Sequence, residues 1–190
     1  MEREGLKAQA EVLIYEHRKG RKVLIHRQKL NTFTMNFIHT MEFFLKGVSA
    51  DTGLVIGLTD LTGASQNVQF QGPHDPSGGS YLATETTGKS LPVRIRIGSS
   101  DAPESRDDYK LGDEKMAESA TVITANSTVK ASASFTPTED IIVREVGLSK
   151  SWRKFETGDV YEFLLLRGVI SERTFSAGTT YTVEIRINFT

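Results

Sequence analysis

The chain has 190 residues, of which 38% are hydrophobic and 25% charged, with a formal net charge of −1 and no cysteine. This composition indicates a globular protein, which we expect to form a single domain over residues 1–190, and it excludes a disordered chain. The near-neutral charge argues against a dedicated nucleic-acid binder, and the lack of cysteine excludes disulfides, thiolate metal ligands and cysteine nucleophiles.

The N-terminal region predicts a β-hairpin. Two short apolar runs, at residues 12–15 and 23–25, flank a basic stretch centred on Gly20. Because apolar residues are adjacent within each run, both faces of the two strands are expected to be covered. That pattern is typical of central strands rather than edge strands.

The next segment predicts the one substantial helix, over Met35–Lys46. Ile38, Met41 and Leu45 recur at helical spacing, and Thr34 stands where an N-cap is expected. We expect this helix to pack with its apolar stripe on a sheet.

From residue 53 onward the segments are of strand type, separated by Gly, Ser, Asp and Pro, with a predicted flexible loop over residues 71–80. In the last segment, 181–189, apolar and polar residues alternate, which is typical of an antiparallel sheet with one wet face. The expected fold is therefore mainly β: an antiparallel β-sandwich, jelly-roll or Ig-like, with one N-terminal helix. The expected buried residues are Ile38, Met41, Leu45, Ile95, Ile97, Val183, Ile185 and Ile187.

Motifs for catalysis or cofactor binding lack their contexts. The four histidines, His17, His26, His39 and His74, are scattered, and only His17 and His26 are expected near each other, in the two arms of the hairpin. The acids after Ile97 do not have the spacing of a calcium loop. We therefore expect no enzyme activity, no catalytic residues, no metal and no cofactor.

Charge is unevenly distributed along the chain. Residues 1–30 contain eight Lys or Arg and four acids, whereas residues 100–118 contain three Lys or Arg and seven acids. Complementary patches steer encounter and fix register. The candidate assembly surface therefore consists of Arg18, Lys19, Arg21, Lys22, Asp101, Glu104, Asp107 and Asp108.

The order of elements resembles that of structural proteins of tailed phages and archaeal viruses. The segments that carry the resemblance are "KVLIHRQKLNTFTMNFIHTMEFFLKG", "VRIRIGSSDAPESRDDYKLGDE", "REVGLSKSW", "FLLLRGVI" and "FSAGTTYTVEIRINF". The resemblance implies a virion component, such as a tail, portal-end, fibre-base or capsid-decorating β-sandwich protein, and no catalytic residues.

The expected function is therefore particle assembly through contacts with copies of the same chain and with other virion proteins. We expect synthesis in the host cytoplasm without a signal peptide, location in the virion, and no membrane span, since no apolar run approaches about 20 residues. Nucleic-acid contact by the basic hairpin is a less favoured role. The alternative function is a carbohydrate- or receptor-binding module (an adhesin), for which the candidate aromatics are Trp152, Phe155, Tyr81 and Tyr109.

Overall fold

The computed structural model describes residues 8–46, 55–69, 91–153 and 159–190, which form two five-stranded sheets, one two-stranded sheet and one helix. In spatial order, the first sheet contains β2 (Arg21–Leu30), β1 (Ala8–Arg18), β12 (Tyr181–Phe189), β9 (Thr128–Phe135) and β8 (Thr121–Ala125). The second contains β3 (Thr32–Phe33), β11 (Val160–Phe175), β10 (Ile141–Arg153), β6 (Val93–Gly98) and β7 (Glu114–Ser119). The small sheet pairs β4 (Val55–Thr59) with β5 (Ser65–Gln69). All the strand pairings are antiparallel.

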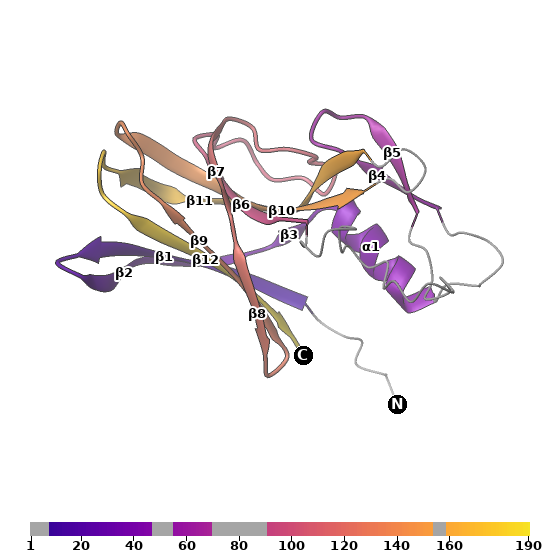
Figure 1. Ribbon diagram of the computed structural model, residues 1–190, viewed down its shortest axis with the longest axis horizontal. Coiled ribbons are helices and arrows are strands. Elements are labelled where there is room, and N and C mark those ends of the chain that lie inside the picture. The colour runs from indigo at the N-terminus through magenta and orange to yellow at the C-terminus, as the bar shows by residue number, and fades with distance from the viewer. Residues whose placement is uncertain (1–7, 47–54, 70–90, 154–158) are drawn as a thin grey trace.

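The two large sheets share one apolar core, which gives a sandwich-like, mainly-β architecture (Figure 1). Strands β1, β9 and β12 contribute to it from the first sheet, and β6, β10 and β11 from the second. Five of the predicted core residues are buried in this cluster: Ile95, Ile97, Val183, Ile185 and Ile187. The alternation in residues 181–189 therefore identified a core strand correctly. The expected wet face was wrong for Thr182 and Glu184, which are buried because β12 lies between β1 and β9 and because His17 and ion-pairing cations lie against them.

The predicted N-terminal hairpin is formed by β1 and β2, which turn through Lys19 and Gly20. Both turn residues have positive φ, 47° and 75°, as a two-residue hairpin turn of type I′ requires. β1 is central, as predicted, but β2 is an edge strand and its first four residues are exposed. The prediction for β2 was wrong because an apolar run does not show whether a further strand follows it in space.

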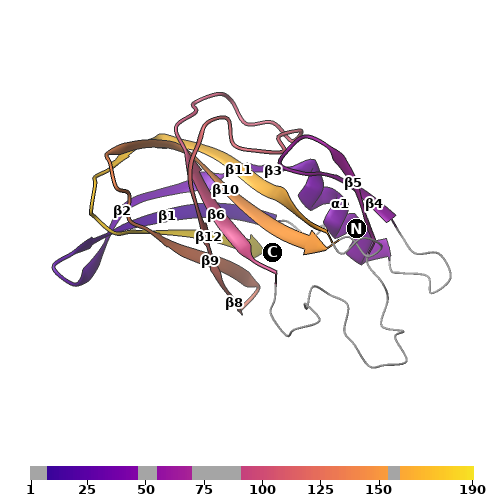
Figure 2. The same cartoon turned by 45° about the horizontal axis from the view of Figure 1, so that its top comes forward.

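The helix α1 (Met35–Lys46) has the predicted bounds, but its contacts differ from the prediction. It lies beyond one end of the two large sheets, beside β4 and the end of β11 (Figure 2). Ile38 and Met41 are only half-buried, whereas the polar Asn36 and Thr40 are buried. The Asn36 side chain bonds the backbone of Thr59 and of Leu164, and the Phe37 ring stacks on that of Phe33, so polar and apolar side chains of the helix both take part in its contacts.

Several sequence predictions concern positions outside the described part of the structure. The side chain of Leu45, expected to be buried, is one of them. The flexible loop over residues 71–80 is another, and with it His74. The single domain over residues 1–190 stays a prediction.

Candidate functional site

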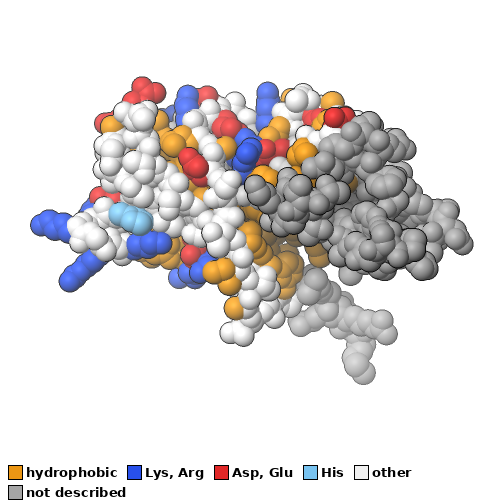
Figure 3. Space-filling model, viewed as in Figure 1, with side chains coloured by type: hydrophobic (Ala, Val, Ile, Leu, Met, Phe, Trp, Pro, Cys, Tyr) orange, Lys and Arg blue, Asp and Glu red, His pale blue; other side chains and the backbone are white. Residues whose placement is uncertain are grey.

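The basic end of the β1–β2 hairpin, which we call the basic tip, consists of Arg18, Lys19, Arg21 and Lys22, all of them exposed. Arg18 forms a bidentate ion pair with Glu16, with N–O distances of 2.7 and 2.8 Å. Among the described residues, none of the other three cations has an ion-pair partner. Lys and Arg side chains therefore project from this end of the molecule (Figure 3).

The loop between β6 and β7, residues 99–113, lies over the outer face of the second sheet. Val146, Leu148 and Leu166 belong to the shared core, so the alternating residues Gly147 and Arg167 face away from it. The loop residue Leu111 is buried against that outer face. An added Cβ at Gly147 would lie 2.9 Å from the Leu111 side chain, so the glycine makes room for the loop.

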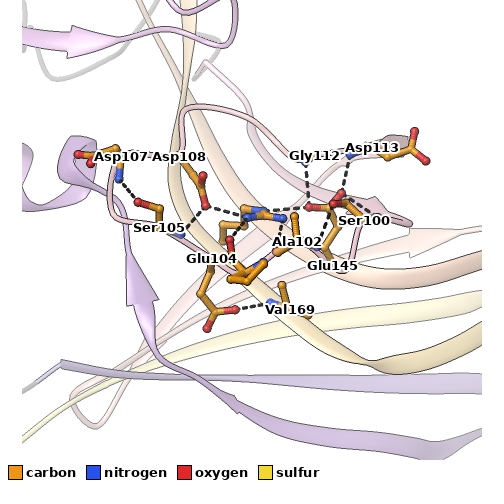
Figure 4. A network of polar contacts seen from close by, with 12 residues as sticks. Ser100, Ala102, Glu104, Ser105, Asp107, Asp108, Gly112, Asp113, Glu145 and Val169 are labelled. Carbon is orange, nitrogen blue, oxygen red and sulfur yellow. Dashed lines mark hydrogen bonds and ion pairs between the residues drawn. The ribbon is translucent and has the colours of Figure 1, made fainter.

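Glu145, on β10, holds both ends of this loop. Its carboxylate is fully buried and accepts backbone N–H bonds from Ser100 (3.3 Å), Gly112 (3.0 Å) and Asp113 (2.8 Å) (Figure 4). Gly98 permits this approach, because a Cβ there would lie 2.5 Å from both the Asp113 carbonyl oxygen and the Glu145 carboxylate. One carboxylate therefore ties the start of the loop to its end.

Arg167, on β11, binds the loop from the side of the sheet. We call Glu145 and Arg167 together the anchor. Its Nε donates to Glu145 at 2.9 Å and its Nη1 to Asp108 at 2.8 Å. The same guanidinium donates to the carbonyls of Ala102 (3.0 Å) and Pro103 (3.2 Å). Burial alone would lower the pKa of Arg167, but the hydrogen bonds to Asp108 and Glu145 outweigh it and raise the pKa, so the group stays charged.

This anchor divides the four predicted acidic site residues into two pairs. Asp108 accepts from Arg167 and from the Ser105 N–H, and Glu104 accepts from the Val169 N–H at 2.9 Å. Both are half-buried parts of the loop's own structure. Asp101 and Asp107 have exposed side chains and face solvent together with the cations Arg106 and Lys110. The outer surface of the loop is therefore less acidic than its sequence.

The structure does not bring the basic tip and the loop of one chain together. The tip forms the end of the molecule opposite α1, while the loop lies over the second sheet nearer to α1, in both views (Figures 1 and 2). A contact between the two surfaces therefore needs two copies of the chain. Glu145 and Arg167 were not among the predicted site residues, although both interrupt apolar runs: Arg167 is the single charged residue of "FLLLRGVI", and Glu145 stands beside Arg144 in "IIVREVGL".

A second buried ionic cluster lies on the same outer face and centres on Arg96. Its guanidinium pairs with Glu162 at 2.6 Å and with Glu114 at 2.5 Å, and Ser149 donates to Glu162 at 2.6 Å. Burial acts to raise the pKa of Glu162, but the hydrogen bonds from Arg96 and Ser149 lower it below its ordinary value. The charges and hydrogen-bonding groups of this cluster pair with one another, which is typical of a cluster that stabilises the fold.

The three histidines within the described residues are not arranged as metal ligands. His17 Nε2 is 2.8 Å from the Thr182 hydroxyl, and His26 Nδ1 is 3.1 Å from Arg173 Nη2. His39 lies half-buried on α1. In the part of the chain that the structure describes, no three His, Asp or Glu side chains are grouped as a metal site would require.

The aromatic candidates for ligand binding are separated or packed. Trp152 is half-buried, with its ring 5.4 Å from that of Phe163. The Tyr109 ring lies close against Gly63, and Tyr81 and Phe155 fall outside the described residues. The described residues therefore show no aromatic platform.

Comparisons with models of protein families, with curated proteins and with solved structures found no match. No helix in the described ranges is long and apolar enough to span a membrane.

Proposed function

We propose that the chain is a structural component of a virus particle, which assembles with copies of itself and with neighbouring virion proteins. The observation that carries the proposal is the basic tip, where three cations without an ion-pair partner among the described residues stand at the end of a hairpin with a tight turn. The resemblance in element order supports the particle setting. Asp101 and Asp107, on the anchored loop, are the acids of a second copy that the tip can reach.

We also propose an Ig-like rather than a jelly-roll arrangement. In Ig domains, strands G, F and C form one sheet, which variable domains extend by C′, and strands D, E, B and A form the other. In the second sheet, the order β11-β10-β6-β7 corresponds to G-F-C-C′. In the first sheet, the order β8-β9-β12-β1 corresponds to D-E-B-A if β12 takes the place of strand B. The connections differ, because β12 follows the other strands in the chain instead of preceding β6.

Charge in such a contact determines register more than affinity. Exposed ion pairs contribute about 0–1 kcal/mol each and are screened by salt, with a Debye length of about 10 Å at 0.1 M. Attraction between the tip and the loop should therefore be strong at low salt only. Most of the affinity comes from apolar area buried in the same assembly.

The test is charge reversal followed by sedimentation velocity at low and high salt. Replacing Lys19, Arg21 and Lys22 with Glu should weaken assembly at low salt, and adding Asp101→Lys and Asp107→Lys should partly restore it. Arg18 is left in place because it already pairs with Glu16. Glu104 and Asp108 are also left unchanged, because reversing them would break the loop itself.

A control changes net charge in the same direction on the other surface. Arg106→Glu with Lys110→Glu makes the loop more acidic and should strengthen assembly at low salt. If this variant weakens assembly as much as the reversed tip does, the effect is general repulsion and the proposed pairing is wrong. If the reversed tip assembles normally but loses salt-sensitive binding to a DNA duplex, the hairpin is a nucleic-acid contact instead.

A further inference from the structure

The edges of the two large sheets differ in how they are protected against pairing with another strand. β2 has four cations, Arg21, Lys22, Arg27 and Lys29, and β7 has Glu114, Lys115 and Glu118. β3 has only two residues. Charges and shortness are the usual devices that keep an edge strand from pairing. β8, Thr-Val-Ile-Thr-Ala, has neither a charge nor a proline.

β8 is also the most exposed strand of the described chain. All five of its residues are exposed, including Val122 at 44% and Ile123 at 50%. Its hydrogen-bonded strand neighbour within the described residues is β9 alone. Figure 1 shows the β8–β9 hairpin projecting from the body of the molecule, and Figure 3 shows hydrophobic side chains gathered in the same area.

The strand register places the two apolar side chains on opposite faces. Val122 is level with Ala131 and Ile185, which are buried in the core, so it lies on the core side of the sheet yet remains exposed. Ile123 is level with Lys130 and Arg186 on the outer side. The strand therefore extends past the opposite sheet and presents apolar groups on both faces.

We propose that two copies of the chain pair through β8, antiparallel and about a two-fold axis, so that the first sheets of both copies join into one. With the axis at Ile123, this residue lies opposite Ile123 of the second copy, Val122 opposite Thr124, and Thr121 opposite Ala125. Each of these pairs shares a face of the sheet, as antiparallel partners do. No like charges oppose one another in this pairing. By contrast, β2 paired with itself about Ile25 would place Arg21 opposite Lys29, and β7 paired about Met116 would place Glu114 opposite Glu118.

Head-to-tail pairing of β8 with β2 of another copy fits less well. The register places β8 level with Arg27–Leu30 of β2. Joining those edges would place the cationic Arg27 and Lys29 beside the apolar residues of β8. The exposed apolar residues of β2, Val23 and Leu24, lie at the other end of that strand. The symmetric pairing avoids this mismatch.

The contact has a limited affinity. Stable interfaces bury about 800 Å² per partner, which a five-residue edge alone does not reach, so dimer formation should depend strongly on protein concentration. It is also independent of the charged surfaces proposed above, because β8 is uncharged. The β8 contact should persist at high salt, where attraction between the basic tip and the loop is screened.

The absence of cysteine permits a direct test of register. In the full chain, Ile123→Cys introduces a single thiol. In the proposed dimer this thiol faces the same thiol of the second copy across the two-fold axis, so mild oxidation should give a disulfide-linked dimer. The controls Thr121→Cys and Leu24→Cys have comparably exposed thiols that the proposed register does not bring together. Cross-linking at 0.5 M salt should be at least about tenfold faster for Ile123→Cys than for either control.

The second measurement is the concentration dependence of sedimentation at high salt. Ile123→Lys should weaken dimer formation at least about tenfold, and Leu24→Lys should leave it unchanged. Equal cross-linking rates in the three cysteine variants, or equal effects of the two lysine variants, would overturn the proposal. A larger effect of Leu24→Lys would also overturn it, and would place the contact at the exposed end of β2 instead. Charge reversal of the basic tip should not change these results. The β8 contact and the contact between the basic tip and the loop are therefore tested independently.

Discussion

Replacing Glu145 with Gln tests whether the buried anchor determines the structure of the loop over residues 99–113. The substitution keeps the side-chain shape but removes the charge that faces Arg167, which is 3% exposed. The amide retains one oxygen for the donors that now converge on the carboxylate: Arg167 Nε and the N–H groups of Ser100, Gly112 and Asp113. Because each carboxylate oxygen accepts two of these donors, the amide leaves two of the four without an acceptor, and Asp108 becomes the one acid that still pairs with the guanidinium among the described residues.

The expected cost is about 3–5 kcal/mol in the free energy of unfolding, the usual penalty for removing one partner of a buried ion pair. For a chain of this size, each kcal/mol lowers Tm by about 2–4 °C, so a fall of roughly 6–20 °C is expected. Urea unfolding at pH 7 measures the free energy. Hydrogen exchange of the Ser100, Gly112 and Asp113 amides should accelerate more than exchange in the core strands.

The matched control is Glu139→Gln, which makes the same chemical change at an exposed acid. It should alter stability by no more than about 0.5 kcal/mol. If Glu145→Gln costs less than about 1 kcal/mol and leaves exchange in the loop unchanged, the anchor does not hold the loop, and the reasoning from burial fails.

Three further predictions concern the core, acid stability and the helix. Truncating the fully buried Ile185 to Ala should cost about 2–5 kcal/mol in urea unfolding, whereas Ile123→Ala should cost less than about 0.5 kcal/mol. Because the folded-state pKa of Glu162 lies below its ordinary value of 4.5, the unfolded chain takes up this proton first, and stability should fall as pH drops from 4.5 through the folded pKa. Glu162→Gln should reduce that slope in urea midpoints measured against pH. Asn36→Ala should cost about 1–3 kcal/mol, because it removes the side chain that bonds both the N–H and the carbonyl of Thr59, and unchanged thermal stability would refute that role.

Local patterns in the sequence determined much of the secondary structure. Alternation identified β12 and its buried residues, because successive side chains of a strand face opposite sides. The helical spacing of Ile38 and Met41 located α1, and the basic stretch around Gly20 located the first turn. These features depend on residues only a few positions apart, so a single sequence is enough to reveal them.

Only the tertiary structure decided which acids of the loop over residues 99–113 face solvent and which bond to the sheet. Asp101 and Asp107 look the same in sequence as Glu104 and Asp108, yet the first pair faces solvent and the second is bonded to β11. The difference arises because Arg167 lies 59 positions from Asp108 in sequence and reaches it only when the loop folds over the sheet.

The same reason applies to the edge strands. The composition of β2 favours a central strand, and that of β8 has no feature typical of an edge strand, yet both form the edges of the first sheet. Their positions depend on the order in which distant segments pair. Likewise, the polar Asn36 of α1 is buried because Thr59 and Leu164 present backbone groups to it. Sequence thus sets the local conformations and the charges available, while long-range pairing decides which of those groups stay at the surface to meet a partner.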